Sequence, residues 1–328
     1  MSKMTIEDIA EKAHVSKSTV SRFLNGGSVK PSTKDKIQKI VEKYDYHPNA
    51  FARLNAKQSG MIGVVVPTLN SKVTSRVVTS IDRYLRDREY VTIIRNSDHD
   101  IQLELENISK LITMGVDGIL LSAISITDEH RKLFARTTVP IVVLAQECES
   151  VVTIVNDEYN AGFFMGEYIG RTGHKTIGFI TVDDSDIAVG KLRSQGVLDG
   201  LKKYDIRNIY TEYSDFSFVD AQNATGKLLS EHSDVDAIIC ATDRIAFGVY
   251  RILHKNRIQI PDDISVVGFG GYEESELITP ELTSLMFDSY EMGERGAMTI
   301  TDLVEGKEVP HRQVIGYSFL ERNSVSKR

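Results

Sequence analysis

From residue 61 onward, short apolar runs alternate with segments whose apolar residues recur at helical spacing. The first run, Ile-Gly-Val-Val-Val at 62–66, is apolar throughout and is followed by Pro67, as expected of a strand buried on both faces. Further strands are expected at 90–95, 118–121, 141–144, 152–155, 177–181, 207–212, 236–240, 264–268 and 284–287, with a final strand pair ending near residue 320. Helices are expected over 77–88, 102–113, 128–136, 159–171, 188–203, 219–230, 243–256 and 290–304. Alternation of this kind predicts parallel sheets covered by helices.

The cycle restarts after the strand at 152–155, so the region divides into two successive units. We therefore predict an α/β fold whose core has two lobes, each with a doubly wound parallel sheet. Ligands of such sheets bind beyond the carboxyl ends of the strands and between lobes. The cleft between the two lobes is the expected ligand site.

The N-terminal segment has a different pattern. Ile6, Ile9, Ala10 and Ala13 give a short helix one apolar face, and Thr5 stands at its expected N-cap. A tight break follows this helix, and a second short helix comes directly after it. Two such helices joined by a short turn are typical of a helix-turn-helix, whose second helix enters the major groove of DNA.

The second helix carries the residue types that this use requires. Ser16 caps it, Val20 and Leu24 form its apolar face, and no acidic residue occurs between Ser16 and Asn25. Its outward positions are Lys17, Ser18, Ser21 and Arg22. Lys and Arg suit guanine edges or phosphates and Ser suits either, which favours DNA binding over a plain helical hairpin.

The charge distribution agrees with a separate DNA-binding head. Residues 1–60 carry 11 Lys and Arg against 6 Asp and Glu, a net charge of +5, whereas the remaining 28 basic and 40 acidic residues give −12. A basic head on an acidic body fits a nucleic-acid-binding module attached to a core that does not touch DNA. The chain has no 18-residue apolar run, no signal-peptide pattern at its N-terminus and only two cysteines, so we expect a cytoplasmic protein with reduced thiols.

The run Thr-Ile-Glu-Asp-Ile-Ala-Glu-Lys-Ala with Val-Ser-Lys-Ser-Thr-Val-Ser-Arg-Phe-Leu-Asn resembles the head of the lactose/galactose repressor (LacI/GalR) family. The core resembles the family along essentially its whole length, most clearly at 172–179, 260–269 and 278–284. The segments at 268–273 and 318–322 resemble disaccharide-operon repressors of the sucrose or trehalose type. The resemblance implies a sequence-specific DNA-binding regulator, a repressor of a sugar-utilisation operon, with a core like that of periplasmic binding proteins.

The resemblance also implies a domain organisation. The head would span 1–47, a hinge helix or linker 48–60, and the effector-binding and dimerisation core 61–328. Within the core, lobe 1 would comprise about 61–157 and 288–317, and lobe 2 about 158–287 and 318–328. The chain would cross between the lobes near 155–160, 286–289 and 317–320.

In the family, residues of the head and the hinge contact the operator. The resemblance implies that Lys17, Ser18 and Arg22 read base edges. The residues that hold phosphates or the turn would be Thr5, Ser16, Thr19, Ser21 and Asn25. The linker would add Asn49, Arg53 and Leu54. Leu54 would wedge into the minor groove at the operator centre, although it stands one residue earlier after the proline than is usual in the family; otherwise it packs on the core at the end of a flexible linker.

Two candidate effector contacts in lobe 2 come from family positions. Arg193, within the helix expected at 188–203, matches an arginine that grips hydroxyls or acids through its fork of donors; otherwise it is a solvated helix arginine. Asp243 follows the strand at 236–240 and matches an aspartate that accepts from paired sugar hydroxyls. Thr242 or Asp243 also stands where a helix N-cap is expected.

Polar and aromatic residues that follow other strands are further candidates. Lys72 and Arg76 follow the first strand at a spacing of four residues, near a helix N-terminus, and suit a phosphorylated sugar or sugar acid; a solvated basic helix face is the alternative. Gln146 follows the fourth strand. Phe216 and Tyr272 are candidates for stacking on a sugar ring, although core packing is the commoner fate of an aromatic residue.

The motifs of an enzyme are missing from the sequence. No dinucleotide-binding Gly-x-Gly-x-x-Gly follows the first strand, and there is no P-loop, no Gly-x-Ser-x-Gly and no zinc-ligand spacing among the eight histidines. We therefore expect no catalytic residues, no metal and no cofactor. The expected partners are double-stranded operator DNA, a sugar or sugar-phosphate effector and a second copy of the chain, with no membrane. The alternatives are a co-repressor-dependent regulator and a soluble sugar-binding receptor.

Overall fold

The structure is a computed structural model in which residues 4–24, 27–44, 46 and 58–328 are described. The N-terminal part is a three-helix head. Its helices are α1 (Ile6–Ala13), α2 (Lys17–Leu24) and α3 (Pro31–Lys43). The hydrophobic core of the head consists of five buried residues, Ile9, Ala10, Ala13, Val20 and Ile37, with half-buried neighbours around them. The helical spacing of the apolar residues accounts for this core, because it places them on facing sides of the three helices.

The first lobe is built on a six-stranded sheet of order β11-β5-β4-β3-β1-β2, in which every pairing is parallel. Its strands are β1 (Met61–Val66), β2 (Val91–Asn96), β3 (Gly118–Ser122), β4 (Ile141–Leu144), β5 (Val152–Asn156) and β11 (Arg312–Ile315). Its helices are α4 (Lys72–Arg86), α5 (Ile101–Met114), α6 (Asp128–Phe134) and α12 (Ser289–Val304). One hydrophobic cluster joins α4 and α12 to one face of the sheet, and a second joins α5 and α6 to the other.

The second lobe repeats this arrangement with the sheet order β12-β10-β9-β8-β6-β7, in which only β12 runs antiparallel to its neighbour. Its strands are β6 (Thr176–Thr181), β7 (Asn208–Tyr213), β8 (Ala237–Cys240), β9 (Ser265–Phe269), β10 (Thr283–Phe287) and β12 (Tyr317–Leu320). Its helices are α7 (Glu158–Arg171), a π-helix η2 (Ile187–Arg193), α8 (Ser194–Lys202), α9 (Phe218–Glu231), α10 (Asp243–Lys255) and α11 (Glu274–Leu277). The prediction of an α/β core with two sheets dominated by parallel pairing is confirmed.

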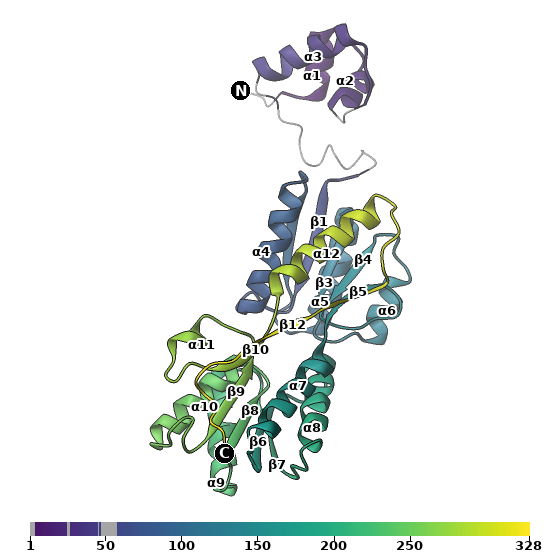
Figure 1. The fold of residues 1–328 in the computed structure, drawn as a ribbon. Helices are drawn as coiled ribbons and strands as arrows, with labels where there is room; N and C mark the ends of the chain where they lie inside the picture. Colours follow the sequence, from purple (N-terminus) through teal and green to yellow (C-terminus); the bar gives the residue numbers. More distant parts are fainter. Residues whose placement is uncertain (1–3, 25–26, 45, 47–57) are drawn as a thin grey trace.

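The chain passes between the lobes three times (Figure 1). The crossings follow β5, β10 and β11, each of which leads directly into an element of the other lobe. The two final strands, expected to end near residue 320, are β11 and β12, and they lie in different sheets, because β11 pairs with β5 in the first and β12 pairs with β10 in the second. The change of sheet falls at Gly316, between these two strands. Three crossings therefore connect the lobes.

Two helices differ from their predicted form. The helix expected at 188–203 is two elements, a π-helix that ends at Arg193 and an α-helix that begins at Ser194. The helix expected from residue 77 begins at Lys72, because the hydroxyl of Ser71 accepts a hydrogen bond from the Thr74 amide at 3.4 Å and caps the helix there. Both changes affect residues that were predicted to bind the effector.

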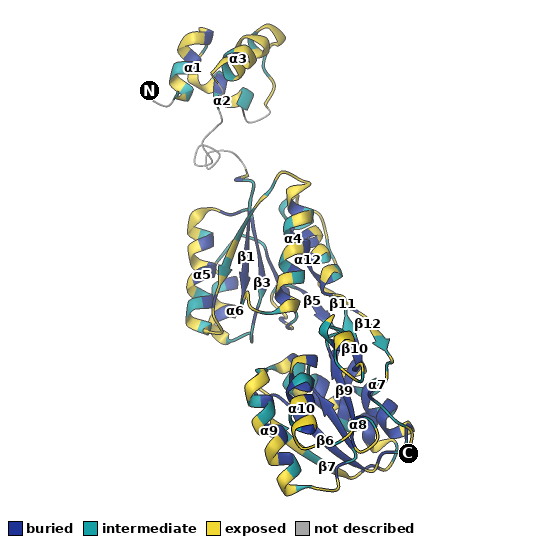
Figure 2. Cartoon of the chain, turned by 90° about the vertical axis from the view of Figure 1, so that its left-hand side faces the viewer, coloured by how far each residue is buried: buried dark blue, intermediate teal, exposed yellow. Residues whose placement is uncertain are grey.

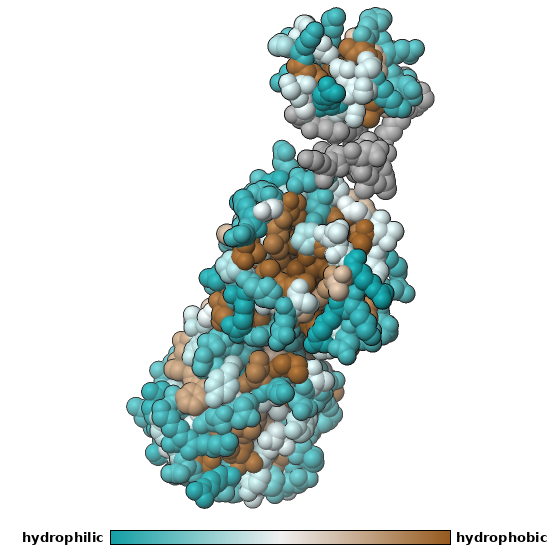
Figure 3. Space-filling model, turned by 90° about the vertical axis from the view of Figure 1, so that its right-hand side faces the viewer, coloured by the Kyte–Doolittle hydropathy of each residue, from teal (hydrophilic) through white to brown (hydrophobic). Residues whose placement is uncertain are grey.

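The burial pattern matches this layered construction. Figure 2 shows the strands as the buried layer of each lobe and the helices with exposed outer faces. Hydrophobic patches lie among hydrophilic residues on both lobes in the face shown in Figure 3.

Cys148 and Cys240 are buried free thiols. Among the described residues, no helix is long and apolar enough to cross a membrane.

Candidate nucleic-acid interface and ligand cavity

The turn between α1 and α2 is made by His14, which adopts the left-handed conformation with φ of 53° and ψ of 48°. The amide of Val15 donates to the carbonyl of Ala10 at 3.0 Å, which closes the end of α1. The hydroxyl of Ser16, two residues after His14, accepts from the Thr19 amide at 3.2 Å and caps α2. These local bonds set α2 at a sharp angle to α1, as in a helix-turn-helix.

Thr5 acts as the cap of α1. Its hydroxyl accepts from the Asp8 amide at 3.2 Å, and the Asp8 carboxylate accepts from the Thr5 amide and hydroxyl at 2.7 Å each. These bonds from Thr5 hold the pKa of Asp8 below that of an ordinary aspartate. The acid of this capping box is therefore charged at neutral pH and sits at the positive end of the helix dipole.

The outward face of α2 is polar and basic. Lys17, Ser18 and Arg22 are exposed, and Ser21 is half-buried. Lys17 forms an ion pair with Glu7 of α1 at 3.5 Å, in which both side chains are largely exposed. The Ser16 hydroxyl lies 2.9 Å from that of Ser18 and 2.8 Å from that of Thr19, so three hydroxyls gather at the first turn of α2. The predicted contacts Asn25, Asn49, Arg53 and Leu54 lie outside the described residues.

A cavity of about 250 Å³ lies between the two lobes. Four of the predicted effector contacts line it: Gln146, Arg193, Phe216 and Tyr272. The first lobe adds small polar side chains, Ser71, Thr74 and Ser122, and the second adds Asp186, Thr242, Phe269 and Phe287. Hydroxyl and amide groups beside aromatic faces suit a polyhydroxylated ring.

Arg193 is the central polar group of this cavity. Its Nε donates to Glu158 Oε2 at 2.8 Å, and one terminal nitrogen lies 2.6 Å from the same oxygen. The other terminal nitrogen donates to the Ala241 carbonyl at 2.5 Å. The guanidinium lies 4.8 Å from the centre of the Phe269 ring. Three of its five N–H donors therefore have partners among the described residues, which leaves two for a ligand.

Tight helix packing fixes the position of Arg193. Gly162 of α7 lies so close to the start of α8 that an added Cβ would come within 2.1 Å of the Arg193 carbonyl oxygen. Arg193 is the last residue of the π-helix. It is only 6% exposed, and it lines the cavity. A π-turn within a helix is frequent at functional sites.

Glu158 was missed by the sequence analysis. It is 4% exposed, and its second oxygen accepts from the Asn156 side-chain amide at 3.1 Å. Burial raises the pKa of Glu158, and the adjacent Arg193 charge opposes that increase. Asn156 and Glu158 stand at the carboxyl end of β5. Other polar residues were predicted to bind the effector because they follow a strand, and the same position in the sequence could have identified Glu158.

Asp243 lies just after β8, as expected, and its contact with an effector stays a prediction. It is buried, and its carboxylate accepts from Ser284 Oγ at 2.6 Å, Ser275 Oγ at 2.8 Å and the Tyr272 amide at 3.1 Å. The cap of α10 is Thr242, whose hydroxyl accepts from the Ile245 amide. Asp243 is absent from the cavity lining and instead fixes the loop that carries Tyr272, which makes it a positioning residue in this structure.

Burial raises the pKa of Asp243, and its three hydrogen bonds oppose that increase. Burial and the nearby Asp243 charge raise the pKa of Tyr272 to about 12. Tyr272 therefore faces the cavity as a neutral phenol, able to donate to an acceptor or to stack on a ring.

Lys72 and Arg76 lie outside this cavity, at the start of α4. They line a neighbouring hollow of about 350 Å³ together with Asn70, Ser71, Ser75 and Glu273. Lys72 pairs with Glu274 at 2.5 Å, and Arg76 pairs with Glu273 at 3.6 Å. Both cations therefore pair with acids of the second lobe, and their role as an anion site or as a solvated basic helix face stays a prediction.

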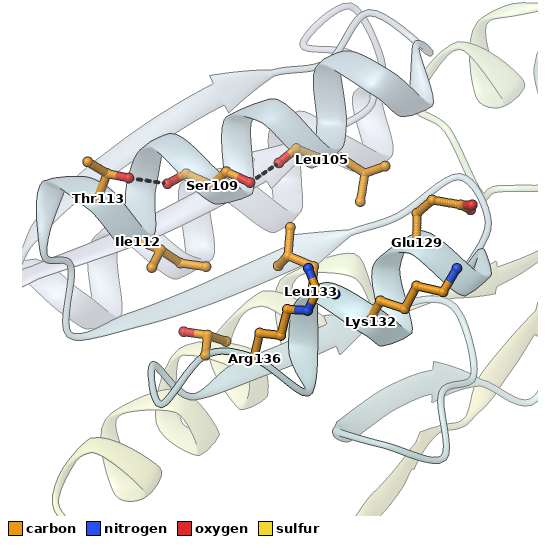
Figure 4. Close-up of a pocket in the computed structure, with 9 residues that line it drawn as sticks. Leu105, Ser109, Ile112, Thr113, Glu129, Lys132, Leu133 and Arg136 are labelled. Atoms are coloured by element: carbon orange, nitrogen blue, oxygen red, sulfur yellow. Dashed lines mark hydrogen bonds between the residues drawn. The ribbon is translucent and has the colours of Figure 1, made fainter.

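A larger hollow of about 530 Å³ lies away from the cleft, between α5 and α6 (Figure 4). The hydroxyls of Thr113 and Ser109 donate to carbonyls of their own helix, at 2.9 Å each. None of the predicted contacts lines this hollow. Among the described residues, no group of His, Cys, Asp and Glu could hold a metal ion.

A helix-turn-helix head joined to a two-lobed core, with an interlobe cavity that carries a few polar groups among apolar walls, is typical of a ligand-binding DNA-binding regulator. Comparisons with known proteins agree with this class. Residues 5–49 match the model of bacterial regulatory proteins of the lacI family, and residues 167–325 match a periplasmic binding protein-like domain.

Similar proteins cover nearly the whole chain. A sucrose operon repressor of Staphylococcus xylosus is 31% identical over 94% of this chain and 97% of its own length. Catabolite control protein A of Priestia megaterium is 28% identical over the same shares. The crystal structure of a Lac repressor dimer bound to operator and an anti-inducer superposes with a TM-score of 0.89 at 24% identity, covering 99% of this chain and all of that chain. The chain belongs to the LacI family of bacterial regulatory proteins. It is a DNA-binding transcription regulator and not an enzyme.

Proposed function

We propose that this regulator represses a sugar-utilisation operon and is released from its operator by a sugar or sugar-phosphate bound between the lobes. One observation carries the effector part of this proposal. The buried Arg193–Glu158 pair presents fixed polar atoms to a cavity whose walls come from both lobes. The sucrose operon repressor among the relatives supports a sugar as the effector.

The DNA-binding part is assigned to the exposed face of α2. Lys17, Ser18 and Arg22 would reach base edges in the major groove, and the hydroxyls of Ser16 and Thr19 would hold the adjacent phosphates. Ser21 would join the phosphate contacts. The proposed contacts outside the described residues are Asn25 beyond α2 and, in the linker, Asn49, Arg53 and Leu54. The protein would act in the cytoplasm, where the DNA is.

We propose a homodimer, because two heads on one particle match a pseudo-palindromic operator. Exposed apolar side chains lie at equivalent topological positions in the two lobes, which supports this assembly. The edge strand of the first sheet carries Val91 and Ile94, and the edge strand of the second ends at Tyr213, close to Val219 of α9. The surfaces of α4 and α5 with their second-lobe counterparts would form the interface.

The effector would act through the relative angle of the lobes. It contacts both walls of the cavity, so it stabilises one lobe arrangement over the other. Because the first lobe leads to the linker and the head, that preference changes how the two heads are spaced. Operator DNA must then lower the affinity for the inducer by the same factor by which the inducer lowers the affinity for DNA.

The test is operator affinity on the DNA upstream of the protein's own gene, measured by fluorescence anisotropy across a panel of free and phosphorylated sugars. We expect one sugar to release the DNA. A sugar that tightens binding would make this a co-repressor system. Sugar binding without any specific DNA binding would favour a receptor and contradict the proposal.

A further inference from the structure

The hollow lined by Lys72 and Arg76 adjoins the interlobe cavity. Ser71 lines both spaces, and Tyr272 and Glu273, which line one each, are consecutive residues. A ligand that fills the cavity and extends past Ser71 therefore enters the hollow. Its walls are Leu69 and polar side chains of the first lobe, faced by Glu273 of the second.

The ion pairs of this hollow connect the two lobes. Lys72 and Arg76 belong to α4, whereas Glu273 and Glu274 lie at the start of α11, about two hundred residues later in the chain. Glu274 Oε2 is buried without a hydrogen-bond partner among the described residues. Each pair includes at least one well-exposed side chain, 42% for both partners of the first and 81% for Glu273. Exposed pairs contribute little to stability and exchange readily.

Arg76 is the less satisfied of the two cations. Its side chain is only 16% exposed, yet its ion pair with Glu273 spans 3.6 Å, beyond hydrogen-bond distance. A guanidinium has five donors arranged to bind a phosphoryl or carboxylate group through two parallel bonds. The Arg76 charge also acts on the Tyr272 phenol, whose ring lines the cavity, and opposes the increase of its pKa. Arg76 therefore lies beside the cavity, in the hollow that shares Ser71 with it.

The arginine inside the cavity differs from Arg76. Arg193 is already neutralised by Glu158, which is buried beside it at 2.6 Å. The cavity proper thus offers an anion no uncompensated positive charge. The hollow holds two cations whose acidic partners belong to the other lobe and remain in contact with solvent, and the partner of Arg76 is 3.6 Å away and 81% exposed. Neutral hydroxyls suit the first space and an anionic group suits the second.

We propose that Lys72 and Arg76 form a subsite for an anionic group of the effector, a phosphoryl or a carboxylate, and that Glu273 and Glu274 occupy these cations until the effector arrives. This inference rests on the proposed function, since it assigns the charge of the effector that binds in the neighbouring cavity. Binding of the anion exchanges both interlobe ion pairs for contacts to the ligand. The effector thereby frees α11 from α4 at the moment it fills the cleft.

The experiment compares neutral and anionic forms of one sugar as releasing agents. Full-length protein on its fluorescent operator is titrated with sucrose against sucrose 6-phosphate, and with glucose against glucose 6-phosphate and glucuronate. We expect an anionic form to release the operator at a concentration about tenfold lower than its neutral parent, as one charge-assisted hydrogen bond allows. The phosphate and glucuronate arms distinguish a phosphoryl group from a carboxylate.

Variants assign the effect to residues. Arg76→Gln and Lys72→Met should each reduce the preference for the anionic form. In the double variant, the releasing concentrations of the neutral and anionic forms should differ by less than about twofold. The double variant Glu273→Gln/Glu274→Gln should lower the concentration of anionic sugar needed for release. Matched controls are Lys110→Met and Arg131→Gln, since both cations are exposed, lie in the same lobe and pair within their own helices. Thermal unfolding monitored by circular dichroism checks that each variant is folded.

The outcomes separate the two proposals. Equal potency of neutral and anionic forms on the wild-type protein would overturn the subsite and leave the proposed function intact. A preference that survives in the Lys72→Met/Arg76→Gln variant would also overturn it, and an unchanged response of the glutamine pair would overturn the role given to Glu273 and Glu274. If no sugar of either kind changes operator binding, the sugar effector of the proposed function is wrong, and the subsite with it.

Discussion

The head and the core hold their functional side chains in opposite ways. The described part of the head has five buried hydrophobic residues, and Lys17 and Arg22 of α2 are exposed to solvent. The core has four hydrophobic clusters, and Arg193, Glu158 and Asp243 are buried with short hydrogen bonds. An exposed basic face suits a partner that brings its own charge and counterions, as DNA does. A buried, pre-organised pair suits a small ligand that is recognised between the two lobes.

This contrast implies that the two functions can be lost separately. The largest effect is expected at the core pair. Arg193→Met leaves Glu158 buried without its cation, which should lower the free energy of unfolding by about 3–5 kcal/mol and remove the effector response. Chemical denaturation and operator release by the identified sugar measure the two effects.

A second variant distinguishes recognition from stability. In Arg193→Met/Glu158→Gln, no charge is left unpaired in the cavity, so stability should largely return while the effector response stays absent. Operator affinity without sugar should match that of the wild type in both variants. A sugar that still releases the double variant from DNA would show that the cavity is not the effector site.

In the head, Arg22→Ala should abolish the preference for operator over unrelated DNA. A bidentate contact to a guanine edge contributes about 1–3 kcal/mol of discrimination between base pairs. A dimer on its operator would make this contact once in each half-site. Competition binding with operator and scrambled DNA measures the preference, and Lys39→Ala on the exposed face of α3 removes a head charge as a control. Retained sequence preference would contradict the assignment of α2 as the recognition helix.

Asp243→Asn should have a smaller effect, through the loop that carries Tyr272. An amide cannot accept from all three donors, so we expect a loss of about 1–3 kcal/mol in stability and a weaker sugar response. Because the folded pKa of Asp243 is raised, the folded state binds this proton more tightly than the unfolded state, and its contribution to stability falls as pH rises above about 4. Unfolding curves measured between pH 4 and 7 should show this loss of stability with rising pH in the wild type and not in the variant.

The smallest change is expected from Glu7→Gln. Its carboxylate pairs with Lys17 at 3.5 Å with both side chains exposed, so the pair should compete only weakly with DNA. Its removal should tighten operator binding by a few tenths of a kcal/mol, with the effect disappearing at high salt. Anisotropy titrations at two salt concentrations are the measurement, and weaker binding of the variant would indicate that Glu7 supports the placement of Lys17.

The sequence predicted the strands and the helix-turn-helix because their signals are local. The apolar run at β1 and the caps Thr5 and Ser16 depend on residues within a few positions of each other. The role of Asp243 could not be read in this way, because its serine partners stand 32 and 41 residues further along the chain. The end of the π-helix at Arg193 packs against Gly162, about thirty residues earlier in the chain, and the partners of Lys72 and Arg76 belong to the other lobe.

The most direct test of this account is release of the operator by sugar from the wild type and from Arg193→Met/Glu158→Gln, measured by anisotropy on the same DNA. The account predicts equal operator affinity without sugar, release of the wild type by one sugar or its phosphate, and no release of the variant. Equal release of both proteins would contradict the claim that the interlobe cavity controls the head.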